Sequence, residues 1–179
     1  MDYNYGAADP LDQNPNQAPK ASLAGPAPLA IPTSASQTVV IATFTGYDVV
    51  LSRSHRTIYT EETLTVEEVL QSQNESLGPA SKVTLLQRGG TVQLPAKTVE
   101  YLTEPRPGVL VPNHRYVLFL EHHAAGDFYW LAQAWELLGG KVEACLPTYR
   151  PNELNDYEGM DESKFLHHVR EAIRRPASR

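Results

Sequence analysis

VLVPNHRYVLFLEHHAAGDFYWLAQAWELLGGKVEAC, residues 109–145, carries the main folding signal of this chain. Within it, residues 115–120 (RYVLFL) form a nearly continuous apolar run of β-forming side chains, which is shorter than a typical helix and is followed by polar residues. Such a run predicts a strand that is buried on both faces.

Two turns follow this run. Residues 124–127 (AAGD) and the pair Gly139-Gly140 each separate two apolar segments, and glycine readily takes the positive φ that tight turns require. The pattern therefore predicts three successive antiparallel strands. Because large aromatic side chains dominate core burial, we expect the densest part of the core here, formed by Phe119, Phe128, Tyr129, Trp130 and Trp135.

The segment before this stretch also predicts strands. Residues 38–52 read as one long strand, or two short ones, bent at Gly46. Residues 57–70 alternate in polarity, as expected for a half-buried strand of an antiparallel sheet. On this strand the apolar Ile58, Leu64 and Val66 face one side, and the carboxylates are expected on the solvated side or in loops, namely Glu61, Glu62, Glu67 and Glu68.

Shorter strands are expected at residues 82–87, 91–94 and 98–103. The pair Gly89-Gly90 lies between the first two and predicts a hairpin or a bulged bend. It does not fit a phosphate-binding loop, because no Lys-Ser or Lys-Thr follows it.

Residues 161–174 predict a helix that begins at the N-cap Asp161, and its apolar side chains recur at helical spacing. In one reading the helix packs over a barrel end or a sheet edge. In the other it is a basic amphipathic helix presented to a partner or to an anionic membrane surface. Its contact residues would then be Phe165, Val169, Arg170 and Arg174.

Residues 1–37 contain six prolines and eight alanines and show no sustained apolar period, which predicts a disordered or extended arm. The arm is either a tether or a segment that orders on a partner. In the second case its anchors would be Tyr3, Tyr5, Leu23, Leu29 and Ile31. The expected organisation is this arm, a β-barrel domain at residues 38–146, and a loop with the helix at residues 147–179.

Composition excludes several classes of function. The net charge is −6, and residues 38–160 carry fifteen acidic and nine basic side chains, which disfavours nucleic-acid binding. No apolar run is long enough to span a bilayer, and residues 1–10 lack the features of a secretory signal. The single Cys145 excludes an intrachain disulfide and multi-cysteine metal clusters, and no flanking cationic cluster lowers its pKa.

The histidine pairs His122-His123 and His167-His168 are the candidates for metal chemistry. Neighbouring side chains diverge on a strand and on a helix, so neither pair alone suits one metal ion. One histidine from each pair, with Asp127 or Glu121, would give a zinc or copper site and a small metal-dependent hydrolase. The sequence contains no His-Glu-x-x-His and no Gly-x-Ser-x-Gly motif, so we assign no catalytic residue, metal ligand or cofactor.

From residue 38 to about residue 146 the order of features resembles an uncharacterised group of bacterial exported domains, which are similar in layout to small OB-like barrels of the netrin-module type. The matching motifs are VVIATFTGY, IYTEETLTVEEVL, VTLLQRGGTV, RYVLFL and the Gly-Gly-Lys-Val pair. The resemblance implies the fold and export to the periplasm or the cell exterior. It transfers no catalytic residue, and inhibition of metalloproteinases is not implied because the amino-terminal cysteine is missing.

The sequence therefore predicts a mainly β protein, either a small antiparallel OB-like β-barrel or a rolled sandwich, with a C-terminal helix and a disordered N-terminal arm. The leading functional hypothesis is a non-catalytic protein-binding or assembly module, an accessory subunit of a larger cell-envelope complex, whose arm and helix make the contacts. The alternatives are the metal-dependent hydrolase with ligands such as His122 and His167, and a barrel that encloses a small apolar ligand. A cytoplasmic location stays open.

Overall fold

The computed structural model describes residues 37–52, 57–95, 97–101, 110–123, 126–145 and 157–174. The predicted arm, including Tyr3, Tyr5, Leu23, Leu29 and Ile31, lies outside these residues. The elements in chain order are β1 (Thr38–Leu51), β2 (Ile58–Ser72), β3 (Lys82–Arg88), β4 (Gly90–Leu94), β5 (Lys97–Tyr101), β6 (Arg115–His123), β7 (Phe128–Leu138), β8 (Lys141–Ala144) and α1 (Glu162–Arg174).

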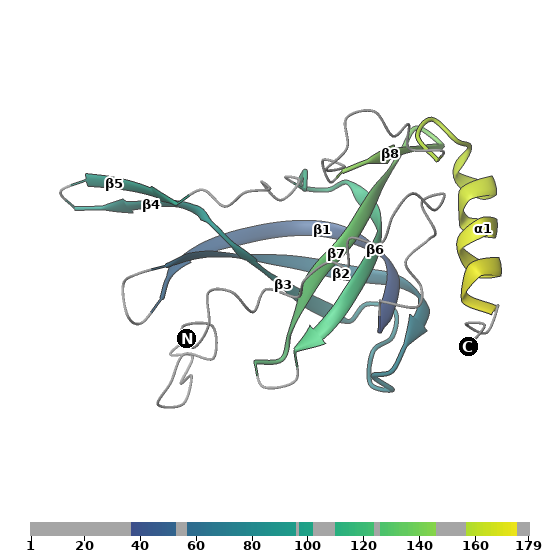
Figure 1. The fold of residues 1–179 in the computed structure, drawn as a ribbon, viewed down its shortest axis with the longest axis horizontal. Coiled ribbons are helices and arrows are strands. Elements are labelled where there is room, and N and C mark those ends of the chain that lie inside the picture. Colours follow the sequence, from purple (N-terminus) through teal and green to yellow (C-terminus); the bar gives the residue numbers. More distant parts are fainter. Residues whose placement is uncertain are drawn as a thin grey trace, which may run out of the picture.

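Five strands close into a barrel in the order β3-β2-β1-β6-β7 (Figure 1). Neighbouring strands are antiparallel except where β3 meets β7, and this parallel pair, at Leu85 and Tyr129, closes the barrel. Five strands are also the number in the OB-like barrel expected from the sequence. The predicted barrel is therefore confirmed, and the alternative of a rolled sandwich is set aside. The predicted meander is also confirmed, since β6, β7 and β8 pair in succession.

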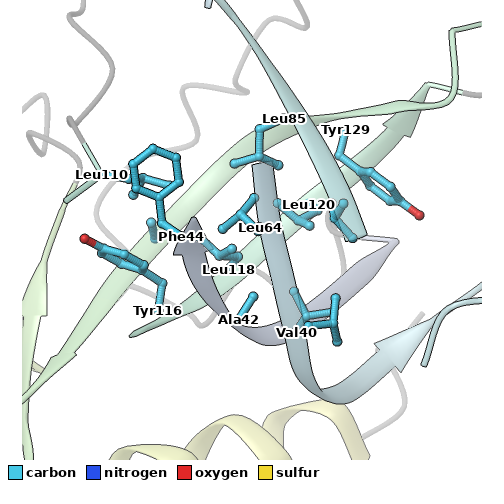
Figure 2. Close-up of a cluster of buried hydrophobic side chains, with 13 residues drawn as sticks. Val40, Ala42, Phe44, Leu64, Leu85, Leu110, Tyr116, Leu118, Leu120 and Tyr129 are labelled. Carbon is cyan, nitrogen blue, oxygen red and sulfur yellow. The ribbon is translucent and has the colours of Figure 1, made fainter. Parts of the chain in front are cut away.

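The first core fills the barrel. Strand side chains alternate between faces, so Val40, Ala42 and Phe44 of β1 point inward together with alternate residues of the other strands. Figure 2 shows these side chains converging from different strands. The segment before β6 adds Leu110, which is 2 % exposed and packs against the same cluster.

The second core lies between the outer face of the barrel and α1. Val117 and Phe119 of β6 point outward into it, while their neighbours point into the barrel. This explains why residues 115–120 are almost entirely apolar. Trp135 of β7 contacts Phe119 edge to face at 5.2 Å between ring centroids, and Phe165 of α1 at 5.3 Å. The Asp161 N-cap is also present, since its Oδ1 accepts a hydrogen bond from the Ser163 amide at 3.0 Å.

Two irregularities shape the side of the molecule away from α1. The register of β1 and β2 shifts between Phe44 and Gly46, which is the bend predicted at Gly46. Gly89 and Gly90 have φ of 114° and 135°, and a Cβ on Gly90 would lie 2.8 Å from Thr60 Oγ1. The pair therefore forms a bend and not a hairpin, because β4 pairs with β5. The ends of β1 and β2 and the β4–β5 hairpin project on the side opposite α1 (Figure 1).

Candidate functional site

The histidines at the end of β6 stack on aromatic rings of β7. The ring of His122 lies 4.8 Å from that of Tyr129, and His123 stacks on Phe128 at 4.7 Å. His122 Nε2 is 3.5 Å from Asp127 Oδ1, close enough for a charge interaction, but its orientation gives no hydrogen bond. The imidazole rings of His122 and His123 therefore serve as packing partners of the aromatic rings on β7.

The other histidine pair lies on the exposed face of α1. Within the ranges that the structure describes, no three His, Cys, Asp or Glu side chains come together in a way that could hold a metal ion. The convergence of one histidine from each pair, on which the hydrolase hypothesis depends, is therefore not found in this part of the chain.

A second polar group lies near the start of β6. His114 Nδ1 contacts Glu136 Oε1 on β7, an acid–imidazole pair of the kind that supports nucleophiles. The nearby Cys145 does not serve as that nucleophile, because burial, with a smaller contribution from Glu136, raises the pKa of its thiol to about 12. The thiol is protonated at neutral pH, and it packs against the barrel core as a small apolar residue.

The helix residues predicted to contact a partner fall into two groups, a buried apolar pair and two arginines that form ion pairs. Phe165 and Val169 are both 0 % exposed in the second core, so a docked α1 does not present them to a partner. Arg170 donates from Nη2 to both carboxylate oxygens of Glu68 at 2.9 Å, which ties α1 to β2. Arg174 is largely exposed and lies 3.5 Å from Glu171. The helix is thus mainly a structural part of the domain.

Glu62 of β2 is buried inside the barrel, contrary to the expectation that it lies on a solvated face. It is 6 % exposed and accepts a hydrogen bond from Gln87 Nε2 at 2.7 Å. Burial raises the pKa of this carboxyl to about 7, although the hydrogen bond from Gln87 acts in the opposite direction. The signal was present in the sequence, since Glu62 has the same parity on the strand as the inward-facing Leu64 and Val66.

The part of the β1–β2 pair that continues past the end of the β1–β6 ladder, residues 46–51 with residues 58–63, is named here the distal ribbon. Tyr47 is 60 % exposed, a high value for a large aromatic side chain. Its neighbour Asp48 lies directly opposite Glu61, and burial and Asp48 together raise the pKa of Glu61. Neither carboxylate forms an ion pair with a basic side chain of the described residues.

The outer backbone edge of β1 in the distal ribbon has no strand partner among the described residues. Pairing of β1 with β6 ends at Thr43, and β4 pairs with β5. The Thr57 carbonyl accepts from the Ser52 amide at 2.7 Å on the β1 side, whereas the Ile58 carbonyl accepts from Gly89 on the β3 side. Odd-numbered residues of β2 therefore face β1.

This alternation sets the direction of the backbone groups on β1. Residues 46, 48 and 50 lie opposite Thr63, Glu61 and Tyr59 and share hydrogen bonds with them. The N–H and C=O groups of Tyr47, Val49 and Leu51 consequently point away from β2. These groups form what is named here the distal β1 edge, which the sequence alone did not reveal.

Comparison with known proteins gave no match among protein families, curated proteins or solved structures. Among the described residues, no helix has both the length and the apolar character needed to cross a membrane.

Proposed function

We propose that this protein is a non-catalytic binding and assembly module that acts as an accessory subunit of a larger complex of the cell envelope. The observation that carries the proposal is the distal ribbon, which has an exposed tyrosine and, beyond the end of the β1–β6 ladder, a backbone edge of β1 that is unpaired in the described part of the chain. Unpaired edges bind further strands readily, and natural proteins usually block or cover them.

The barrel supports a scaffolding role. Its interior is occupied by closely packed side chains such as Phe44, Leu64 and Leu118, each exposed by 1 % or less. Filled interiors are the norm in barrels of this size, so this packing gives no support to an enclosed apolar ligand. The hydrolase alternative likewise gains no support from the described histidines. The envelope location rests on the resemblance in layout to exported bacterial domains.

Capture of a partner under native conditions tests the proposal. The full chain, tagged at its C-terminus, is incubated with soluble and membrane fractions of its own cells, and bound proteins are quantified by mass spectrometry. We expect one protein in stoichiometric amount, competed away by untagged chain. A chain that remains a monomer and retains no protein from either fraction would refute the proposed function.

Removing the helix is not a suitable variant for this experiment. Deletion of residues 161–179 would expose the second core, since it takes away Phe165 and Val169. Point substitutions on the distal ribbon avoid this problem, and Leu138→Ser offers a matched control because Leu138 is also an exposed apolar residue, 45 % accessible, at the β7–β8 turn.

A further inference from the structure

We infer that the distal β1 edge binds an extended strand of the partner protein, which carries a lysine or arginine opposite Asp48. This inference rests on the proposed function and names the chemistry of its contact. The strand would add to the sheet beside β1, so that main-chain hydrogen bonds supply affinity and side chains supply specificity.

The backbone geometry defines the site. Tyr47, Val49 and Leu51 each direct an N–H and a C=O away from β2, so an added strand would make regular ladder hydrogen bonds over residues 47–51. Every second residue of the added strand would face the same side of the sheet as Asp48.

The charges on this side define the partner. Like charges directly opposite each other destabilise a sheet, and Asp48 and Glu61 form such a pair without a basic partner among the described residues. Neighbouring strands lie about 5 Å apart, so a basic side chain opposite Asp48 would interact with Asp48 directly and with Glu61 one strand further away. A cation supplied by the partner would thus relieve a repulsion that the described residues leave in place.

The remaining side chains of the edge are mostly apolar. Tyr47, Val49 and Leu51 lie on one side of the sheet, and Val50 follows Asp48 on the other, where it packs against a small cluster with Tyr59. The preferred strand is therefore apolar or β-branched on both sides, with one basic residue.

A second copy of this chain is disfavoured as the occupant. A symmetric antiparallel pairing of two distal β1 edges would bring Asp48 of one copy close to Asp48 of the other, which adds a third like charge to the site. The chain's own residues 102–109 (LTEPRPGV) include Pro105 and Pro107, which lack the N–H that a ladder needs. The arm has one basic residue within residues 1–37, Lys20, which could lie opposite Asp48. The arm is therefore the occupant that the experiments must distinguish from a separate protein.

Three synthetic peptides test the charge preference. Each alternates Thr and Val, carries the same dye and solubilising tag, and differs at its central residue, which is Lys, Gln or Glu. By fluorescence anisotropy at low salt, we expect the Lys peptide to bind about fivefold more tightly than the Gln peptide, a ratio typical of an exposed charge interaction, and the Glu peptide to bind most weakly. Equal affinities, or no saturable binding of the Lys peptide, would overturn the inference.

Matched variants test the edge itself. Tyr47→Pro removes one outward N–H, whereas Tyr47→Val removes the same exposed ring and keeps the N–H. We expect Tyr47→Pro to weaken binding of the Lys peptide about fivefold more than Tyr47→Val does, since one ladder hydrogen bond is lost. Asp48→Asn should abolish the preference for Lys over Gln. Circular dichroism confirms that each variant is folded, and identical affinity of the two Tyr47 variants contradicts strand addition.

The same variants separate this inference from the proposed function. If the captured partner binds wild type and Tyr47→Pro equally, the protein is a binding module but this edge is not its site, and the inference fails alone. If no partner is captured, the proposed function fails. A chain lacking residues 1–35 completes the set: peptide binding that rises tenfold or more on deletion would identify the arm as the natural occupant and overturn the assignment to a separate protein.

Discussion

Replacement of Glu62 by Gln should make the folded domain less sensitive to pH. The pKa of Glu62 is about 7 in the folded protein, against 4.5 for the free side chain. The folded state therefore holds its proton over a pH range in which the unfolded chain has lost it. Stability from this group is fully present below about pH 4.5 and is lost as the pH rises through 7.

The size of the effect follows from the difference in pKa. Each unit corresponds to about 1.4 kcal/mol, so ionisation of Glu62 costs the folded state about 3 kcal/mol by pH 8. Glutamine keeps the shape of the protonated acid and a hydrogen-bond acceptor for Gln87. We expect Glu62→Gln to match wild type near pH 4.5 and to be more stable by about 3 kcal/mol at pH 8.

Urea unfolding followed by tryptophan fluorescence measures this difference. For a domain of this size the free energy of unfolding falls by roughly 1.5 kcal/mol per molar urea, so the midpoint at pH 8 should rise by about 2 M in the variant. The control is Glu75→Gln, which replaces an exposed carboxylate in the loop after β2. A difference between Glu62→Gln and wild type that is the same at pH 5 and at pH 8 would show that Glu62 does not retain its proton when folded.

Three further predictions concern the packing. Phe165→Ala should lower the free energy of unfolding by about 3 to 5 kcal/mol, because a fully buried ring leaves a cavity between α1 and the barrel, whereas Leu138→Ala should change it little; urea unfolding compares the two. Gly90→Ala should lower the melting temperature clearly more than Gly46→Ala, since only Gly90 combines a positive φ with contacts too close for a Cβ; equal melting temperatures would contradict this. Cys145 should react with a thiol reagent at pH 8 about a thousandfold more slowly in the folded protein than after unfolding, because its pKa is about 12 and not 9; a fast reaction without urea would show that the thiol is not buried as described.

The local elements could be predicted because their signals are local. Residues 116–120 are all apolar or aromatic, so both faces of the strand carry such side chains. This is sufficient to predict the doubly buried strand β6. Alternation likewise predicts β2, and the helical spacing of Phe165 and Val169 predicts α1. In each case the pattern repeats over a few neighbouring residues, and the burial it predicts for the apolar side chains was found, whereas Glu62 on β2 is buried against expectation.

The candidate site depends on contacts between segments far apart in the chain. The inward position of Glu62 is tolerated because Gln87, on another strand, supplies a hydrogen bond, and that pairing follows from the register of β2 and β3. The distal β1 edge exists because pairing with β6 ends at Thr43, which reflects the length of β6 and not the composition of β1. The parity of Glu62 with Leu64 indicates its inward direction, but the hydrogen bond from Gln87 does not follow from the local pattern around Glu62. The end of the β1–β6 pairing likewise does not follow from the pattern around Tyr47.

The closure of the barrel also bears on how the protein folds and opens. β1 meets β2 through a ladder that runs from Thr38 to Leu51, whereas β3 meets β7 at the single parallel bridge between Leu85 and Tyr129. Joining these two residues closes a long stretch of chain, and the entropy of that closure is repaid by few hydrogen bonds. The seam between β3 and β7 should therefore form last during folding and separate first in native-state fluctuations. The backbone N–H and C=O groups of Leu85 face Glu62 on β2, so the amides that point across the seam are those of Leu86 and Tyr129. Amide hydrogen exchange at these two residues should show weaker protection than at Val40 and Leu118.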